Sequence, residues 1–168
     1  LTESLKSEVQ SNPIKFPKEL GEEHPFSMKM MEDTYCKFGI AKAHIDKHID
    51  FIISPGFYVT GPKQAVNLIN KFIQESDFEN VVRTWILEGL NKGNGYLEIQ
   101  VDGKKIELKV VNANNMYVKR DEFGVVEKYH QYIGQSNVFQ PNKVIPFEPE
   151  QIIHLPVNPI GDSAYGYG

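Results

Sequence analysis

Apolar residues recur at helical spacing through the first half of the chain. Between residues 27 and 54 they fall three or four positions apart, which is typical of an amphipathic helix with one buried face. The string Ser54-Pro55-Gly56 ends this pattern, so we expect one helix over residues 27–54. Its expected buried face consists of Met31, Tyr35, Phe38, Ala41, Ile45, Ile49 and Ile52.

Two further helices are predicted before residue 92. A short strand candidate at residues 57–60 and the turn Gly61-Pro62 precede the first of them. Asp77 is a credible N-cap for the second. The expected buried positions are Val66, Leu68, Ile69, Phe72 and Ile73 in the first, and Val81, Val82, Trp85, Ile86 and Leu90 in the second.

After Gly95 the pattern changes to a period of two, which indicates β-strands. Asp102-Gly103 predicts a type I′ turn between the first two strands, and residues 121–124 connect a second hairpin. The predicted strands cover residues 96–101, 105–110, 116–119, 125–132, 138–139 and 151–155. Helices followed by an antiparallel meander make the predicted fold class α+β.

The chain divides into an arm and one domain in this interpretation. Residues 1–26 mix charges, serines and prolines without periodicity, so we expect a flexible N-terminal arm. Residues 27–168 form the predicted domain. Within it, helices fill residues 27–92, the meander fills residues 95–157, and residues 158–168 begin a link to a further part of the protein. Because the chain begins with Leu1 and stops at Gly168 without a helix or cap, we expect a fragment.

Composition narrows the function classes. With 168 residues and 40% hydrophobic content, the chain can bury a core of its own. A net charge of −4 gives no general attraction to nucleic acid or to an anionic membrane. No apolar run approaches the roughly 18 residues that a membrane span requires, so we expect a soluble protein with no membrane partner. The single cysteine, Cys36, excludes an intramolecular disulfide and is expected to be a small buried hydrophobic residue.

His44 and His48 form the most metal-like pair, because residues four apart share a helix face. No glutamate follows His44, no third ligand is evident nearby, and Lys47 would repel a cation. A solvated helix face is therefore the favoured interpretation. A metal-dependent hydrolase that uses both histidines and Asp50 is the disfavoured alternative.

The glycine-rich string Gly93-Asn94-Gly95 superficially resembles a phosphate-binding loop. Phosphate loops run from a strand into a helix N-terminus, whereas here a helix ends and a strand begins. The partial negative charge of a helix C-terminus repels phosphate. We therefore expect Gly93 or Gly95 to supply the positive φ that ends the helix, and Asn94 to cap carbonyls or cross to a neighbouring strand.

No catalytic constellation has support from the sequence. His130 and His154 lie on predicted strands that have one core face, and Glu98 and Glu107 are expected to face outward on a hairpin. The tyrosines of the strand region are expected to pack and not to stack on nucleotide bases; they are Tyr58, Tyr96, Tyr117, Tyr129 and Tyr132. We expect no enzymatic activity, no cofactor and no metal.

Several strings in order are similar to tailed-bacteriophage portal proteins. Leu87-Glu88-Gly89-Leu90-Asn91-Lys92-Gly93-Asn94-Gly95-Tyr96-Leu97-Glu98-Ile99 resembles the family's helix followed by "GNAYLEI". Gln151-Ile152-Ile153-His154-Leu155 and Gly161-Asp162-Ser163-Ala164-Tyr165-Gly166-Tyr167-Gly168 resemble its "IIHL … YGLS" segment. The resemblance covers about residues 30–168. In this chain Gly95 replaces the usual alanine, which is expected to loosen the turn, and Gly168 stands where serine is common.

The resemblance implies the outer, wing-like part of a portal subunit, with architectural roles for the motif residues and a link to the stem that starts at residues 158–168. Those motif positions are Gly93, Asn94, Gly95, Tyr96, His154, Asp162, Tyr165 and Gly166. It also implies a homo-oligomeric ring, a dodecamer in the full-length protein, at one vertex of the virion capsid and assembled in the host cytoplasm. The ring would be the passage for double-stranded DNA, not specifically bound by this part, and would dock capsid, packaging-motor and tail-connector proteins.

Two points stay open at the level of sequence. The helical half with residues 57–59 is our candidate for part of the ring contact, since its amphipathic helices offer ample apolar surface. The alternative to a portal is a non-viral α+β protein-interaction module without catalysis. For a portal, the sequence leaves open whether it belongs to a free phage or to an integrated element (a prophage).

Overall fold

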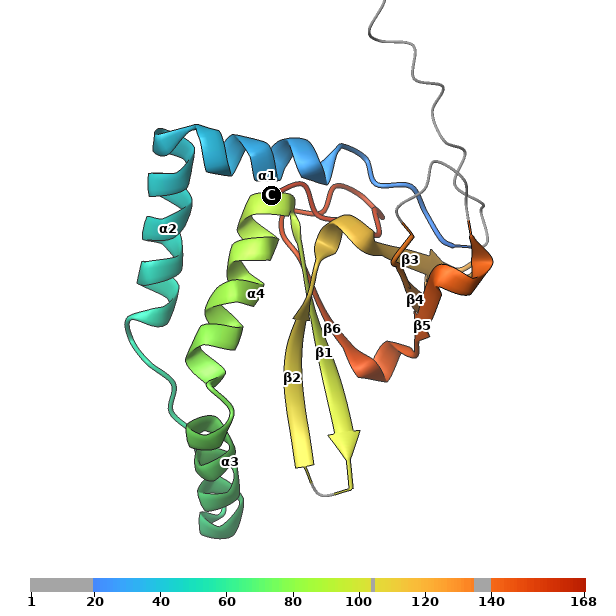
Figure 1. The fold of residues 1–168 in the computed structure, drawn as a ribbon. Helices are drawn as coiled ribbons and strands as arrows, with labels where there is room; N and C mark the ends of the chain where they lie inside the picture. The colour runs from blue at the N-terminus through green and yellow to red at the C-terminus, as the bar shows by residue number, and fades with distance from the viewer. Residues whose placement is uncertain (1–19, 104, 135–139) are drawn as a thin grey trace, which may run out of the picture.

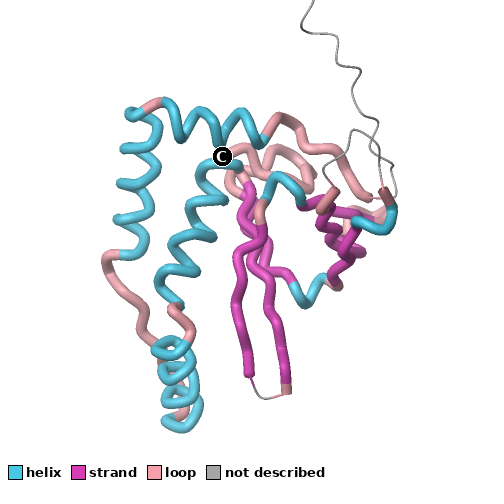
Figure 2. The backbone as a smooth tube through the Cα atoms, in the orientation of Figure 1, coloured by secondary structure: helices cyan, strands magenta, loops and turns pink. Residues whose placement is uncertain are grey.

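The computed structural model describes residues 20–103, 105–134 and 140–168, in which helices come first and strands follow (Figures 1 and 2). The helices are α1 (Met28–Lys37), α2 (Gly39–Ile53), α3 (Lys63–Glu75) and α4 (Phe78–Lys92). The strands are β1 (Asn94–Asp102), β2 (Lys105–Val111), β3 (Met116–Arg120), β4 (Val126–Tyr132), β5 (Val144–Phe147) and β6 (Ile152–Pro156). Short 3-10 turns are η1 (Ala113–Asn115), η2 (Pro141–Lys143) and η3 (Pro149–Gln151). The predicted α+β class is confirmed.

The strands form two antiparallel sheets, with the orders β2-β1-β6 and β3-β4-β5. Both predicted hairpins are present, as β1–β2 and β3–β4. The last strand does not extend the meander but returns to β1, where Tyr96 pairs with His154 and Leu97 with Ile153. This return makes β1, which starts at the end of α4, the central strand of its sheet. The predicted strand at residues 138–139 lies outside the described residues, as does Lys104 of the β1–β2 turn.

The single helix expected over residues 27–54 is wrong, because the chain breaks into α1 and α2 at Phe38. Phe38 has an extended backbone, with φ −108° and ψ 101°, and Gly39 begins α2. The two helices run in clearly different directions (Figure 1). The break also overturns part of the expected apolar face, since Phe38 is 63% exposed. Cys36 is exposed as well, which corrects the expectation that it is buried.

Two cores hold these elements together. The larger one lies between the two sheets and the start of α1, and it consists of Met28, Tyr96, Val111, Ala113, Met116, Val118, Tyr129, Phe147, Ile152 and Tyr165. The smaller one joins α2 to α4 through Ile49, Ile53, Val82 and Ile86. Ile52, expected in this core, is mostly exposed, and Ile53 takes the buried place instead.

Helix α3 forms where it was predicted, but its expected buried face is wrong. None of its residues is buried, and Leu68 and Ile69 are exposed. The strand expected at residues 57–60 is also wrong. This segment is irregular, Tyr58 is 88% exposed, and the Phe57 ring lies edge-on to Phe78 at 5.3 Å.

Asp77 takes the predicted N-cap position of α4 without capping through its side chain. Its backbone is left-handed, with φ 49°, and its carboxylate accepts a hydrogen bond from the Asn80 side chain at 2.8 Å.

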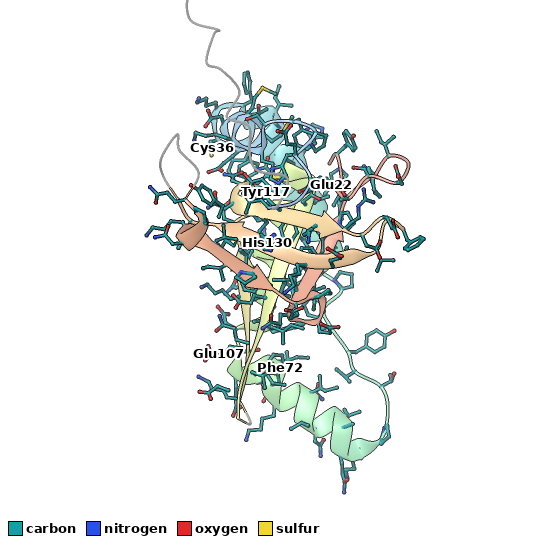
Figure 3. All side chains as sticks on the ribbon, turned by 90° about the vertical axis from the view of Figure 1, so that its right-hand side faces the viewer. Glu22, Cys36, Phe72, Glu107, Tyr117 and His130 are labelled. Carbon is teal, nitrogen blue, oxygen red and sulfur yellow. The ribbon has the colours of Figure 1, made fainter. Side chains whose placement is uncertain are left out.

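The residues just before α1 pack on the second sheet. Leu20 is buried against Tyr117 and Tyr132, and the Glu22 N–H donates to the Val118 carbonyl at 3.0 Å. Figure 3 shows Glu22 and Tyr117 close to this sheet. Residues 20–26, which were assigned to the arm, therefore contact the domain, while residues 1–19 lie outside the described residues. None of the helices in the described part of the chain has the length and hydrophobicity of a transmembrane segment.

The α2–α4 core gives a direct test of the fold. Ile49 is 1% exposed, so Ile49→Ala should lower the free energy of unfolding by about 2–5 kcal/mol through lost burial and a residual cavity. Ile52→Ala, on the same helix but 53% exposed, is the matched control and should cost less than about 1 kcal/mol. Urea denaturation followed by circular dichroism measures both. Equal losses in the two variants would contradict this packing.

Candidate functional site

Helix α4 ends at Gly93, where the chain passes directly into β1. Gly93 has φ +75°, the left-handed conformation that glycine adopts without strain, so it ends the helix as one of the two predicted glycines. Its carbonyl accepts a hydrogen bond from the N–H of Val157 at 2.8 Å. We call Gly93-Asn94-Gly95 the junction and residues 157–168, which pass over it, the return segment.

Asn94 joins the junction to the return segment through its side chain, which is fully buried. Its Oδ1 accepts from the Gly166 N–H at 2.9 Å, and its Nδ2 donates to the Gly166 carbonyl at 3.1 Å. This double exchange imitates the backbone pairing of two strands. It also fixes which end of the amide is oxygen, because the Gly166 N–H needs an acceptor.

The same Asn94 oxygen contacts His154 of β6. The His154 Nε2 lies 3.0 Å from Asn94 Oδ1, and because an amide oxygen only accepts, His154 must donate from Nε2. Its ring stacks on Tyr96 at 4.3 Å between centroids. We expected Asn94 to cap carbonyls or to cross to another strand. Its hydrogen bonds to Gly166 and His154 cross to other segments. Its 3.4 Å hydrogen bond to the Lys92 carbonyl is a capping contact.

Close backbone contacts explain the glycines. A Cβ on Gly93 would lie 2.4 Å from the Gly166 oxygen, and a Cβ on Gly166 would lie 2.3 Å from the Gly93 oxygen. A Cβ on Gly95 would lie 2.5 Å from the Trp85 oxygen. The expectation that Gly95 loosens the turn is therefore wrong, since the strand starts in tight contact with α4.

Tyr165 ties the return segment to the second sheet. Its hydroxyl donates to the Glu22 carbonyl at 2.7 Å and accepts from the Val118 N–H at 3.0 Å, and burial raises its pKa. Asp162 accepts a hydrogen bond from Arg120 through its backbone carbonyl. The Arg120 guanidinium in turn forms a two-point pair with Glu22, at 2.5 and 2.9 Å.

Lys92, the last residue of α4, is a site residue that the sequence analysis missed. It is 2% exposed, and its Nζ lies 2.9 Å from Glu88, 3.3 Å from Glu32 of α1 and 3.3 Å from the Asn112 side chain. A hydrogen bond from Asn114 and the charge of Lys92 lower the pKa of Glu32. The four-residue spacing of Glu88 and Lys92 on a predicted helix is the sequence feature that could have indicated this ion pair.

The other candidate chemistry is not brought together. His44 bonds to the Ile40 carbonyl at 3.0 Å on α2, and among the described residues no three His, Cys, Asp or Glu side chains are grouped for a metal. His130 contacts the Leu20 carbonyl at 2.6 Å, whereas His154 contacts Asn94. The junction contacts hold helix, strand and return segment together in one α+β domain.

The comparisons with known proteins agree with this class. The family described as "Phage portal protein, SPP1 Gp6-like" matches residues 29–154, and the chain belongs to this family. No curated protein sequence matches.

Two solved structures resemble the chain over about half its length. A chain of "Virion of native gene transfer agent (GTA) particle" is 24% identical with a TM-score of 0.44, and covers 53% of this chain and 24% of its own. A chain of "Neck of native GTA particle computed with C12 symmetry" is 26% identical with a TM-score of 0.40, and covers 52% and 24%. The match thus spans about a quarter of each of those chains.

Removing the side-chain N–H donors of Asn94 tests whether its hydrogen bonds stabilise the junction. Asn94→Asp keeps the shape but places a carboxylate against the Gly166 carbonyl, so the free energy of unfolding at pH 7 should fall by at least about 2 kcal/mol. Asn67→Asp, an exposed position on α3, is the control and should change stability by no more than about 0.5 kcal/mol. Chemical denaturation measures both, and an unchanged Asn94→Asp variant would contradict the assigned bonds.

His154 predicts an acid-sensitive junction. Burial lowers its pKa from 6.5 to about 4, so the folded state holds the ring neutral while the unfolded state protonates near pH 6.5. The unfolded state then binds more protons, and stability should decline as the pH falls from 6.5 to about 4.

The contribution of His154 to this decline should be about 1–3 kcal/mol. His154→Gln removes the titration and leaves His24, whose pKa burial also lowers, as a shared background. Urea denaturation at pH 7 and pH 4.5 compares the two proteins. An equally steep loss in His154→Gln would show that other groups cause the acid sensitivity.

Proposed function

We propose that this chain is the wing-like part of a portal subunit, which assembles into a ring at one capsid vertex. The observation that carries the proposal is the family match over residues 29–154, which extends from α1 to β6. The ring would form the passage for genome packaging and ejection, and would dock the packaging motor and the tail connector. The proposed location is the virion, after assembly in the host cytoplasm.

The charge of the chain supports a passage that does not grip DNA. Each phosphate neutralised by lysine or arginine adds salt-dependent affinity, which would retard a duplex that must move. The net charge here is −4, and basic and acidic residues are interspersed. We propose that DNA passes through the ring without specific binding to this part, and that the wing contacts neighbouring subunits and the capsid shell.

The motif residues have a structural role in this proposal. Asn94 and Gly166 lie at the place where the return segment crosses the junction, and Tyr165 anchors that segment to the second sheet. The contacts support the proposal that the family motif secures this crossing. The division into an arm at residues 1–26 and a domain at residues 27–168 remains a proposal, in which residues 20–26 of the arm pack on the domain.

Electron microscopy of the full-length gene product tests the function. We expect negatively stained particles to average to rings with a central hole, and light scattering after size exclusion to give a mass of about twelve subunits, the ring number that the portal resemblance implies. The 168-residue chain alone is the comparison, and its own mass does not decide the question. A full-length protein that stays monomeric at high concentration would contradict a portal and favour a non-viral interaction module.

A further inference from the structure

Helix α2 is apolar on two opposite faces. Ile49 and Ile53 pack against α4, whereas Ile40 and Phe51 lie on the other side of the helix and are 78% and 65% exposed. Ile40 and Phe51 are eleven residues apart, about three turns, so they share one face. Lys47 lies on this face as well, with its Nζ 4.8 Å from the centre of the Phe51 ring. A helix with apolar residues on both faces is ordinarily covered on both.

A second apolar surface lies between α3 and the β1–β2 hairpin. It is a groove of about 900 Å³, lined on one side by Leu68, Ile69 and Phe72 and on the other by Ile106 and Leu108. Phe72 of α3 and Glu107 of β2, both labelled in Figure 3, are two of its lining residues. Leu68 is 70% exposed and Ile106 48% exposed. A thirteen-residue helix has only marginal stability in water by itself. We therefore expect the exposed face of α3 to be covered by another surface.

The two ends of the described chain lie away from this groove. Gly168 donates to the Val157 carbonyl near the C-terminal end of α4, and Leu20 packs on the β3-β4-β5 sheet. The groove lies at the opposite end of α4, beside the hairpin turn (Figure 1). A second copy of the chain is the occupant that this arrangement favours.

The charges on the two surfaces are complementary. On the groove rim, Glu75 pairs with Lys71 at 3.8 Å and Glu107 pairs with Lys105. Among the described residues the carboxylate of Asp77, also on the rim, forms no ion pair and accepts a hydrogen bond only from the Asn80 side chain. Within the same part of the chain Lys47 on α2 forms no ion pair either, so each surface brings one free charge of opposite sign.

We infer that the outer face of α2 in one copy docks into the α3–hairpin groove of the next copy, with Lys47 close to Asp77 of its neighbour. The contact joins two different surfaces, so its repetition forms a ring when the rotation between neighbouring copies divides a full turn evenly. It rests on the proposed portal function, because it assigns the surfaces through which neighbouring subunits would meet. It also keeps the helical half as the ring contact, but replaces the expected strand at residues 57–59 with a groove.

Cross-linking of the full-length protein tests the pairing. In a background where Cys36 and other exposed cysteines are replaced by serine, differently tagged Phe51→Cys and Leu68→Cys subunits are co-expressed and treated with a short bismaleimide. Cross-links should join the two tags, and neither variant alone should form dimers. Self-linking of Leu68→Cys would overturn the inference in favour of a symmetric contact.

A matched pair of charge substitutions tests the groove. Leu68→Glu should weaken subunit association at least about tenfold, since it places a charge in an apolar contact. Asn70→Glu lies about 200° around α3 and should leave association unchanged. Unfolding midpoints of both proteins should match, because both positions are exposed.

The outcomes separate the interface from the function. Rings that form with neither cross-links nor sensitivity to Leu68→Glu would overturn this interface and leave the portal proposal intact. A protein that forms neither rings nor cross-links would overturn both. Cross-links between the tags together with impaired Leu68→Glu rings would support both.

Discussion

The amide of Asn94 makes hydrogen bonds to three parts of the chain at once, and the remaining contacts of the junction depend on it. Its oxygen and nitrogen exchange bonds with Gly166, its oxygen contacts His154, and its nitrogen reaches the Lys92 carbonyl. A buried amide that loses a hydrogen-bond partner destabilises the fold by its full desolvation free energy. Helix end, central strand, returning strand and return segment must therefore all be in place together.

Steric limits reinforce this constraint. The backbones of Gly93 and Gly166 approach so closely that neither position has room for a Cβ, and Gly95 lies equally close to α4. The buried Lys92 acts on the helical side of the same point, where Glu88 and Glu32 neutralise its charge. Since a buried charge without its partner is strongly destabilising, Lys92 fixes α1 relative to α4. Hydrogen bonds thus hold the sheets to the junction, and an ion cluster holds the helices to it.

The sequence predicted those features that depend on neighbouring residues. The alternation after Gly95 predicted the β1–β2 hairpin, and the glycine-rich string predicted that a glycine ends α4. The sequence could not show that β6 returns to β1, because pairing between strands about sixty residues apart leaves no periodic trace. It also missed Lys92, whose burial depends on Glu32 of a different helix. Helical periodicity was taken to mean burial within one chain, although Phe38 and Leu68 follow that spacing and are exposed.

The distribution of buried and exposed side chains divides the molecule into two ends. Around the junction, the side chains of Asn94, Tyr165 and Lys92 are buried and bonded. At the far end of α4, by contrast, α3 has no fully buried residue, and Val101 and Ile106 near the hairpin turn are exposed. A chain that had to be stable alone would gain by covering that end or making it polar. The exposed apolar face of α3 is the surface that the proposed contact between copies would bury.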